Sequence, residues 1–143
     1  MEFQSSRTIS ASPSSVFAAF ADSERLAVWW GPDGFTSTFA TYEFEPDGKW
    51  SFVMHGPDGK DYNNEIVIKE IEPSRRIVIR HVSQPHYLLE ITFEPTVDGG
   101  TLVGWNQDFE NPETARLLKH IVVPANEQLL NRLNAEVLSK QSN

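Results

Sequence analysis

Six apolar residues recur at spacings of three and four near the end of the chain, and they constrain the fold more than any other feature. They are Leu118, Val122, Ala125, Leu129, Leu133 and Val137. This spacing places them along one side of an α-helix between about Asn111 and Leu138. Such a stripe must be buried, and the preceding chain has the pattern of short strands divided by turns. The expected burial partner is therefore one face of an antiparallel sheet.

The order of the earlier elements follows from caps and turns. A first strand is expected at about Phe3–Ser10, followed by a helix that Ser12 caps and Pro13 opens, and by a second short helix capped by Asp22. Proline, aspartate and glycine clusters then divide the chain into strand-length runs. These predict six further strands at about 37–44, 49–55, 61–71, 76–82, 86–94 and 101–109.

Short hairpin loops fix which residues oppose each other, so one face of the sheet can be followed from strand to strand. This inner face is expected to comprise Tyr42, Phe44, Trp50, Phe52, Met54, Tyr62, Asn64, Ile66, Ile68, Ile77, Ile79, His81, Tyr87, Leu89, Ile91, Phe93, Val103, Trp105, Gln107 and Phe109. His81 should oppose Tyr87, and Leu89 should oppose Gln107. Unpaired buried polar groups cost roughly 1–3 kcal/mol each, so these polar residues must pair, hold water or contact a ligand.

Pro124 interrupts the pattern of the last helix because it cannot donate a hydrogen bond to the carbonyl of His120. We expect either a kink or a short helix that ends near Val123 and a new one from Pro124. Ala125 and Asn126 follow, and they are small where the flanking stripe is large. A bend with small residues above an aromatic sheet predicts a space between the helix and the sheet. Asn126 either contacts a ligand there or binds a carbonyl that Pro124 leaves free.

Composition bounds the class of protein. The 143 residues suit a single domain spanning 1–143, and the net charge of −8 opposes binding to nucleic acid or to anionic lipid. The chain has no cysteine, which rules out disulfides and thiolate metal sites. Neither a leader nor an apolar run long enough for a membrane span is recognised, so a cytoplasmic location is expected.

Catalytic and metal-binding patterns are sparse. The histidines His55, His81, His86 and His120 do not have the spacing of a metal site, and we expect neither a metal nor a cofactor. Glycine-rich phosphate loops and Gly-x-Ser-x-Gly elbows are missing. His81 is the one candidate general base on the inner face, and a core histidine with satisfied hydrogen bonds is the favoured alternative. The loop with Trp29, Trp30 and Phe35 is interpreted as an anchor for the short helices, with a lid as the alternative.

Several short motifs resemble the activator-of-heat-shock-protein-90-ATPase-like family of the START-like (SRPBCC), helix-grip superfamily. They are Ser12-Pro13-x-x-Val16-Phe17, Trp29-Trp30-Gly31-Pro32, Gly48-x-Trp50-x-Phe52-x-Met54, Gly56-Pro57-Asp58-Gly59, Glu70-Ile71-x-Pro73 and Gln128-x-x-x-Arg132-Leu133. The resemblance implies an α+β helix-grip fold, with about seven antiparallel strands wrapped around a long C-terminal helix and two short helices between the first two strands. It also implies a cavity that holds lipids, hormones or polyketide-like molecules in the wider superfamily. Many members carry Gly-Trp where this chain has Ala125-Asn126.

Three functions remain open at this point. The leading one is the binding of a small hydrophobic or amphipathic molecule between the last helix and the sheet. The others are co-chaperone-like stimulation of a heat-shock chaperone ATPase, and a cyclase or hydrolase reaction with His81 as base. A homodimer through an exposed sheet edge or through the valine-bearing outer face is a further alternative. The residues expected to line the cavity are Trp30, Trp50, Phe52, Met54, Tyr62, Ile79, His81, Tyr87, Leu89, Trp105, Gln107, Leu118, Val122 and Asn126.

Overall fold

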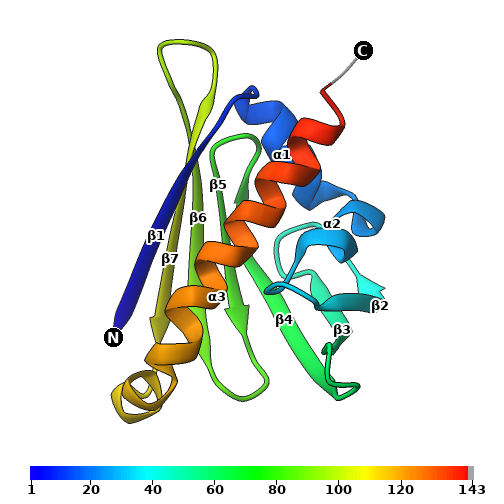
Figure 1. Ribbon diagram of the computed structural model, residues 1–143, viewed down its shortest axis with the longest axis vertical. Coiled ribbons are helices and arrows are strands. Elements are labelled where there is room, and N and C mark those ends of the chain that lie inside the picture. Colours follow the sequence, from blue (N-terminus) through cyan, green and yellow to red (C-terminus); the bar gives the residue numbers. More distant parts are fainter. Residues whose placement is uncertain (142–143) are drawn as a thin grey trace.

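A long helix, α3, crosses one face of a seven-stranded antiparallel sheet in the computed structural model, which describes residues 1–141 (Figure 1). The strands are β1 (Glu2–Ile9), β2 (Thr36–Tyr42), β3 (Lys49–His55), β4 (Asp61–Glu72), β5 (Arg76–His81), β6 (Tyr87–Pro95) and β7 (Thr101–Phe109). Their order across the sheet is β1-β7-β6-β5-β4-β3-β2. The predicted helix-grip architecture is confirmed.

The first two helices begin at the predicted caps, and the third begins close to its expected start. α1 (Pro13–Ala21) is capped by Ser12, and α2 (Ser23–Trp29) is capped by Asp22, which accepts a hydrogen bond of 2.9 Å from the Glu24 amide. α3 (Pro112–Ser139) begins after Asn111, whose side chain accepts from the amides of the first turn. The short helices α1 and α2 lie beside the second half of α3 (Figure 1). Together the three helices cover the inner face.

The strand register confirms the predicted opposition of His81 to Tyr87 and of Leu89 to Gln107. Tyr42 opposes Trp50, as expected. The register between β2 and β3 shifts between Phe39 and Thr41, because one strand carries an extra residue there. As a result Phe39 packs on the core as well as Tyr42, an inward residue that simple alternation does not predict.

The helix α3 is continuous through Pro124, so a division into two helices is the wrong alternative. Its first turns, drawn in gold, run in a different direction from the rest (Figure 1). Its two halves are unequally buried. Leu129, Leu130, Leu133 and Val137 are buried in the main core, whereas Leu118 and Val122 are half-buried against a small cluster that includes Phe3 and Phe109.

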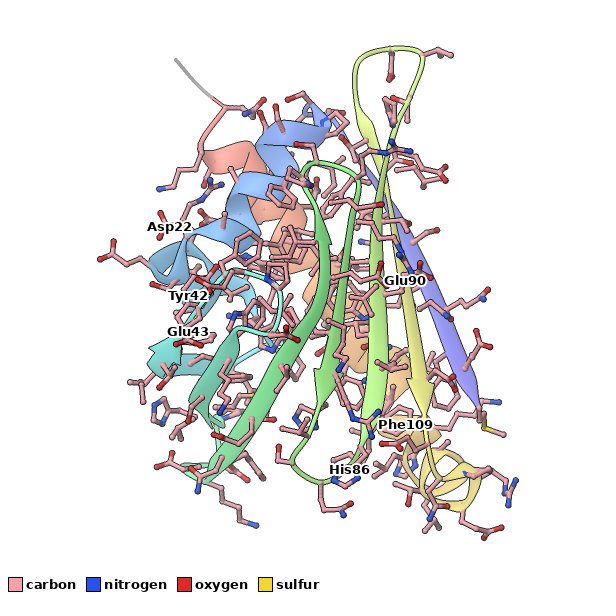
Figure 2. All side chains as sticks on the ribbon, turned by 180° about the vertical axis from the view of Figure 1, so that it is seen from behind. Asp22, Tyr42, Glu43, His86, Glu90 and Phe109 are labelled. Carbon is pink, nitrogen blue, oxygen red and sulfur yellow. The ribbon has the colours of Figure 1, made fainter. Side chains whose placement is uncertain are left out.

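The outer face of the sheet is polar. Seen from behind, it carries charged side chains such as Glu90, while the helices lie on the far side (Figure 2). Glu90 accepts a 2.6 Å hydrogen bond from Arg76 Nε. Within residues 1–141, no helix has the length and apolar character needed to cross a membrane. That same part of the chain holds no group of three His, Asp or Glu side chains that could bind a metal.

Candidate functional site

A pocket of about 150 Å³ lies between the inner face and α3, beside the loop that follows α2. It is lined by Trp30, Gly31, Pro32, Met54, Asn64, Tyr87, Leu89, Trp105, Gln107, Ile121, Val122, Ala125, Asn126 and Leu129. The walls are mainly apolar and aromatic, with four residues that carry polar groups on their side chains besides the indoles: Asn64, Tyr87, Gln107 and Asn126. A largely apolar pocket with a few convergent polar groups has the character of a small-molecule site.

Two buried amides meet across this pocket. Asn126 Nδ2, on α3, donates a 3.0 Å hydrogen bond to Gln107 Oε1, on β7. Each of the two residues is only 7% exposed. Asn126 therefore binds a sheet side chain, so the alternative in which it binds a carbonyl that Pro124 leaves free is not what the structure shows. The bond joins the helix to the sheet at the level where the small residues leave space.

His81 lies behind the pocket wall and is not one of its lining residues. Its Nδ1 lies 2.7 Å from the Pro85 carbonyl oxygen, and its Nε2 lies 2.7 Å from Asn64 Oδ1. Its ring stacks on that of Tyr87, with ring centroids 4.6 Å apart. Burial lowers the pKa of the imidazole, against smaller opposing effects of hydrogen bonds with the Pro85 and Ser83 backbones. His81 thus holds Asn64 and Tyr87 in place.

Tyr87 presents a neutral phenol to the pocket. Burial raises its pKa far above the usual value, and a hydrogen bond with Gln107 opposes this only in part. Its ring also packs against Phe109, with centroids 5.2 Å apart. A strand pair thereby brings a hydroxyl next to the buried amides.

The loop after α2 is held in place by α3. Arg132 donates four hydrogen bonds of 2.6 to 2.8 Å to the carbonyl oxygens of Val28, Gly31, Pro32 and Phe35. Because a guanidinium has five N–H donors in a fixed fork, it can satisfy several carbonyls of one turn at once. Two residues of this turn, Gly31 and Pro32, line the pocket. The helix α3 therefore forms one wall of the pocket itself and, through Arg132, positions the wall that this loop forms.

Gln128 adds a further contact, since its Oε1 accepts a 3.1 Å hydrogen bond from the Asp33 amide. Gly31 has φ of +124°, and a Cβ there would lie 2.7 Å from Met54 Cε. The positive φ favours glycine, and any Cβ there would also force the Met54 methyl group to move. The Trp-Trp-Gly-Pro and Gln-x-x-x-Arg motifs, about 100 residues apart in sequence, are therefore one structural unit.

The tryptophans of this loop have different surroundings. Trp29 is fully buried, and its Nε1 donates a 3.1 Å hydrogen bond to the Ala19 carbonyl, as an anchor does. Trp30 is 5% exposed and packs on Trp50 and Trp105, with ring centroids 5.6 and 5.7 Å away. Trp30 also lines the pocket. The second tryptophan is thus both an anchor and a wall.

The structure brings part of the predicted lining together. Of these residues, the ones that lie in the pocket wall are Trp30, Met54, Tyr87, Leu89, Trp105, Gln107, Val122 and Asn126. Those that lie outside it are Trp50, Phe52, Tyr62, Ile79, His81 and Leu118.

The differences have physical reasons. Trp50, Phe52 and Ile79 are in the core, where other side chains cover them. Tyr62 is 44% exposed and packs near Phe35, because it stands near the start of β4. Lining residues that were not predicted are Gly31, Pro32, Asn64, Ile121, Ala125 and Leu129. The sequence did give a signal for three of them: Asn64 belongs to the predicted inner face of the sheet, and Ala125 and Leu129 belong to the apolar stripe of the last helix.

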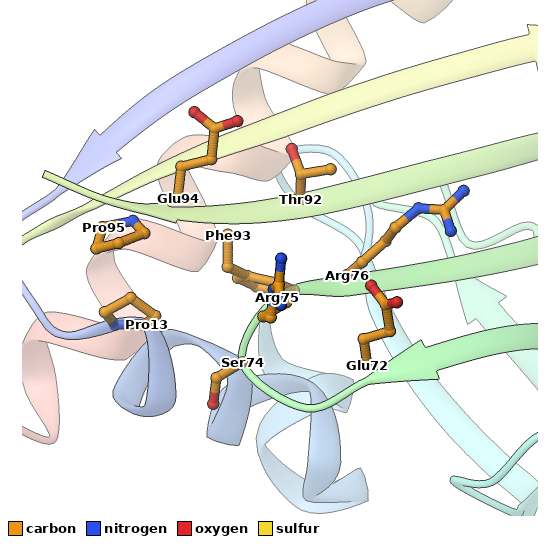
Figure 3. Close-up of a pocket in the computed structure, with 9 residues that line it drawn as sticks. All are labelled: Pro13, Glu72, Ser74, Arg75, Arg76, Thr92, Phe93, Glu94 and Pro95. Carbon is orange, nitrogen blue, oxygen red and sulfur yellow. The ribbon is translucent and has the colours of Figure 1, made fainter.

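A second recess, of about 530 Å³, lies at the opposite end of the sheet (Figure 3). Its lining includes Glu72, Arg75 and Glu94, which are exposed, and Arg76, which is engaged by Glu90 and Glu70 at 2.6 and 2.8 Å. A ligand there would remain in contact with water and would find Arg76 already paired. The pocket under α3, with its buried amides, is the stronger candidate site.

Comparisons with known proteins agree with this fold. The family model described as Activator of Hsp90 ATPase homolog 1-like protein matches residues 10–137. A solved protein from Nitrosomonas europaea is similar, with a TM-score of 0.90, 16% identity, and coverage of 100% of this chain and 97% of that one. A protein from Arthrobacter aurescens has a TM-score of 0.89 at 21% identity, covering 99% and 88%.

A protein of unknown function from Staphylococcus aureus has a TM-score of 0.79 at 14% identity, covering 99% and 96%. A search of curated proteins finds no match. At these identities the likeness to solved structures concerns the fold alone.

Proposed function

The chain belongs to the Activator of Hsp90 ATPase homolog 1-like family, and on this basis we propose that it binds a small apolar or amphipathic molecule between α3 and the sheet. The observation that carries the proposal is the pocket of about 150 Å³ with apolar walls and a buried amide pair. Such a space is large enough for a small ring, since an engineered apolar cavity of ~150 Å³ takes up benzene. A pocket of this kind lowers the free energy of an apolar ligand by removing it from water.

The test is a titration of the isotopically labelled protein with toluene, followed by NMR. We expect the largest shifts at residues of the pocket wall, such as the Trp30 and Trp105 indoles. The substitution Ala125→Phe places a ring in the pocket and should abolish these shifts. Ala135→Phe makes the same change at an exposed position of α3 and should leave them intact. Toluene that causes no shifts in the wall, or that binds Ala125→Phe as well as wild type, would contradict the proposal.

A second candidate function rests on the family's printed description, which refers to activation of a heat-shock protein 90 ATPase. It would require a protein surface that recognises the chaperone. A pull-down and an ATPase assay with the host's chaperone test it, and stimulation that survives in Ala125→Phe would separate this role from the pocket. No stimulation at saturating protein would exclude it.

A reaction with His81 as general base is not favoured by the geometry. Both ring nitrogens already have protein partners at 2.7 Å, the Pro85 carbonyl and the Asn64 side-chain amide, and His81 is not one of the residues that line the pocket. A general base must reach the proton that it abstracts. His81→Gln should therefore leave toluene binding largely unchanged, apart from any shift of the Asn64 amide.

A further inference from the structure

The walls of the pocket under α3 carry no ionisable group in its charged form. Its lining residues include no aspartate, glutamate, lysine, arginine or histidine, and Tyr87 is held as a neutral phenol. A charged ligand would lose its hydration there without meeting a counter-ion, at a cost that for buried charges is large. The site therefore favours a ligand without net charge.

The amide pair defines which hydrogen-bonding groups remain available. The bond from Asn126 Nδ2 to Gln107 Oε1 leaves Asn126 Oδ1 as an acceptor and Gln107 Nε2 as a donor. Within residues 1–141 nothing donates to Asn126 Oδ1, and of the two Gln107 Nε2 hydrogens one at most is directed at the Tyr87 hydroxyl. Rotating both amides by 180° exchanges the roles but again leaves one acceptor and one donor.

These two groups belong to residues that are only 7% exposed, and both residues line the pocket. Neither atom is among the fully enclosed polar atoms without a partner, which in the described chain are Trp50 Nε1, Trp105 Nε1 and Asn106 Oδ1. Asn126 Oδ1, which accepts no hydrogen bond in the described chain, therefore still reaches open space, and Asn126 and Gln107 both line the pocket. The protein thus offers an acceptor, Asn126 Oδ1, next to a donor, Gln107 Nε2. The matching ligand group carries a donor next to an acceptor.

We propose that the pocket recognises a small neutral molecule bearing a carboxamide or lactam group on an apolar ring. This inference rests on the proposed function and specifies its ligand class. The N–H of the ligand donates to Asn126 Oδ1, and its carbonyl oxygen accepts from Gln107 Nε2. The ring packs against Trp30, Met54 and Leu89. A single ring fits the volume, whereas a steroid or a long acyl chain exceeds it.

The test compares three compounds of nearly equal shape in NMR titrations: benzamide, acetophenone and benzoate. Benzamide carries the donor and the acceptor, acetophenone lacks the donor, and benzoate is charged. Because losing the donor also leaves Asn126 Oδ1 unpaired, we expect acetophenone to bind about tenfold more weakly than benzamide. Benzoate should be weaker still. In Asn126→Leu, benzamide should lose its advantage over acetophenone while toluene continues to bind.

The outcomes separate the two proposals. If toluene binds in the pocket but benzamide and acetophenone agree within twofold, the ligand class is wrong and the proposed function stands. Benzoate binding tightest would also overturn the ligand class. If neither toluene nor benzamide shifts the resonances of the wall, both proposals fail. The wild-type series alone decides between these results, so the conclusion does not depend on the folding of Asn126→Leu.

Discussion

Replacing Arg132 by lysine tests the link between α3 and the pocket loop. The guanidinium makes four hydrogen bonds, to the carbonyls of Val28, Gly31, Pro32 and Phe35. A lysine ammonium has three donors on one atom and cannot span the same fork, so about two of these bonds are lost. A hydrogen bond to a charged group contributes roughly 1.5–3 kcal/mol, and partial access of water to these carbonyls reduces the cost. We expect Arg132→Lys to lower the free energy of unfolding by about 2 kcal/mol.

The measurement is urea denaturation followed by circular dichroism, together with a thermal melt. For a domain of this size, about 2 kcal/mol corresponds to a fall in Tm of roughly 6 °C. Arg116→Lys is the matched control, because Arg116 lies on the same helix, its side chain is 55% exposed, and its one salt bridge within residues 1–141 is to Glu113, one turn away. It should change stability by less than about 0.5 kcal/mol. Equal losses of stability in the two variants would refute the role of Arg132 in holding the loop after α2. Wild-type affinity for toluene in a destabilised Arg132→Lys would also refute it.

Three more predictions follow from the site. Burial lowers the pKa of His81 in the folded state, so as the pH falls the unfolded chain takes up this proton first. The free energy of unfolding that depends on neutral His81 should therefore be complete above about pH 6.5 and should decrease below it. The decrease should be at most about 1.4 kcal/mol per pH unit. Denaturation between pH 5 and 7.5 should show a flatter dependence for His81→Gln, and parallel curves would disprove this. For the amide pair, Gln107→Leu and Asn126→Leu should each lower the free energy of unfolding by about 1–3 kcal/mol. In a double-mutant cycle, the double variant should lose less than the sum of the two single losses. Strictly additive losses would mean that the two side chains are not coupled. Gly31→Ala should cost about 1–3 kcal/mol in denaturation and displace Met54, whereas an unchanged midpoint would contradict the φ of +124° and the 2.7 Å approach.

The order and type of the elements could be predicted because local chemistry determines them. Ser12 and Asp22 cap the helices where expected, α3 begins next to Asn111, and the hairpin turns set the register that opposes His81 to Tyr87. The bulge near Ala40 was not predictable, since no glycine or proline marks it. Periodicity also gave no sign that Phe39 would reach the core.

The site was harder to predict, because alternation along a strand determines the face of a residue but not what covers it. Tyr62 has the spacing of an inner-face residue, yet it is 44% exposed. Trp50 and Ile79 also have this spacing, and there the core is filled by other side chains. Arg132 was visible only as a member of a motif, since its role depends on carbonyls about 100 residues earlier. The pairing of Asn126 with Gln107 likewise joins elements whose relative position is set by tertiary packing.

The unequal burial of α3 has a consequence for how a molecule would reach the pocket. The half after Pro124 is fastened by Leu130, Leu133 and the Arg132 contacts, whereas Ile121 and Val122, before Pro124, form one side of the pocket and keep much of their surface in water. Displacing the first half would expose only the small cluster of Phe3, Phe109 and Ala115, whereas displacing the second half would open the main core, so the first half costs less to move. Amide hydrogen exchange should accordingly be faster in residues 113–123 than in 128–137. The entrance would then open beneath the early turns of the helix, while the later turns keep the sheet and the tryptophan loop in register.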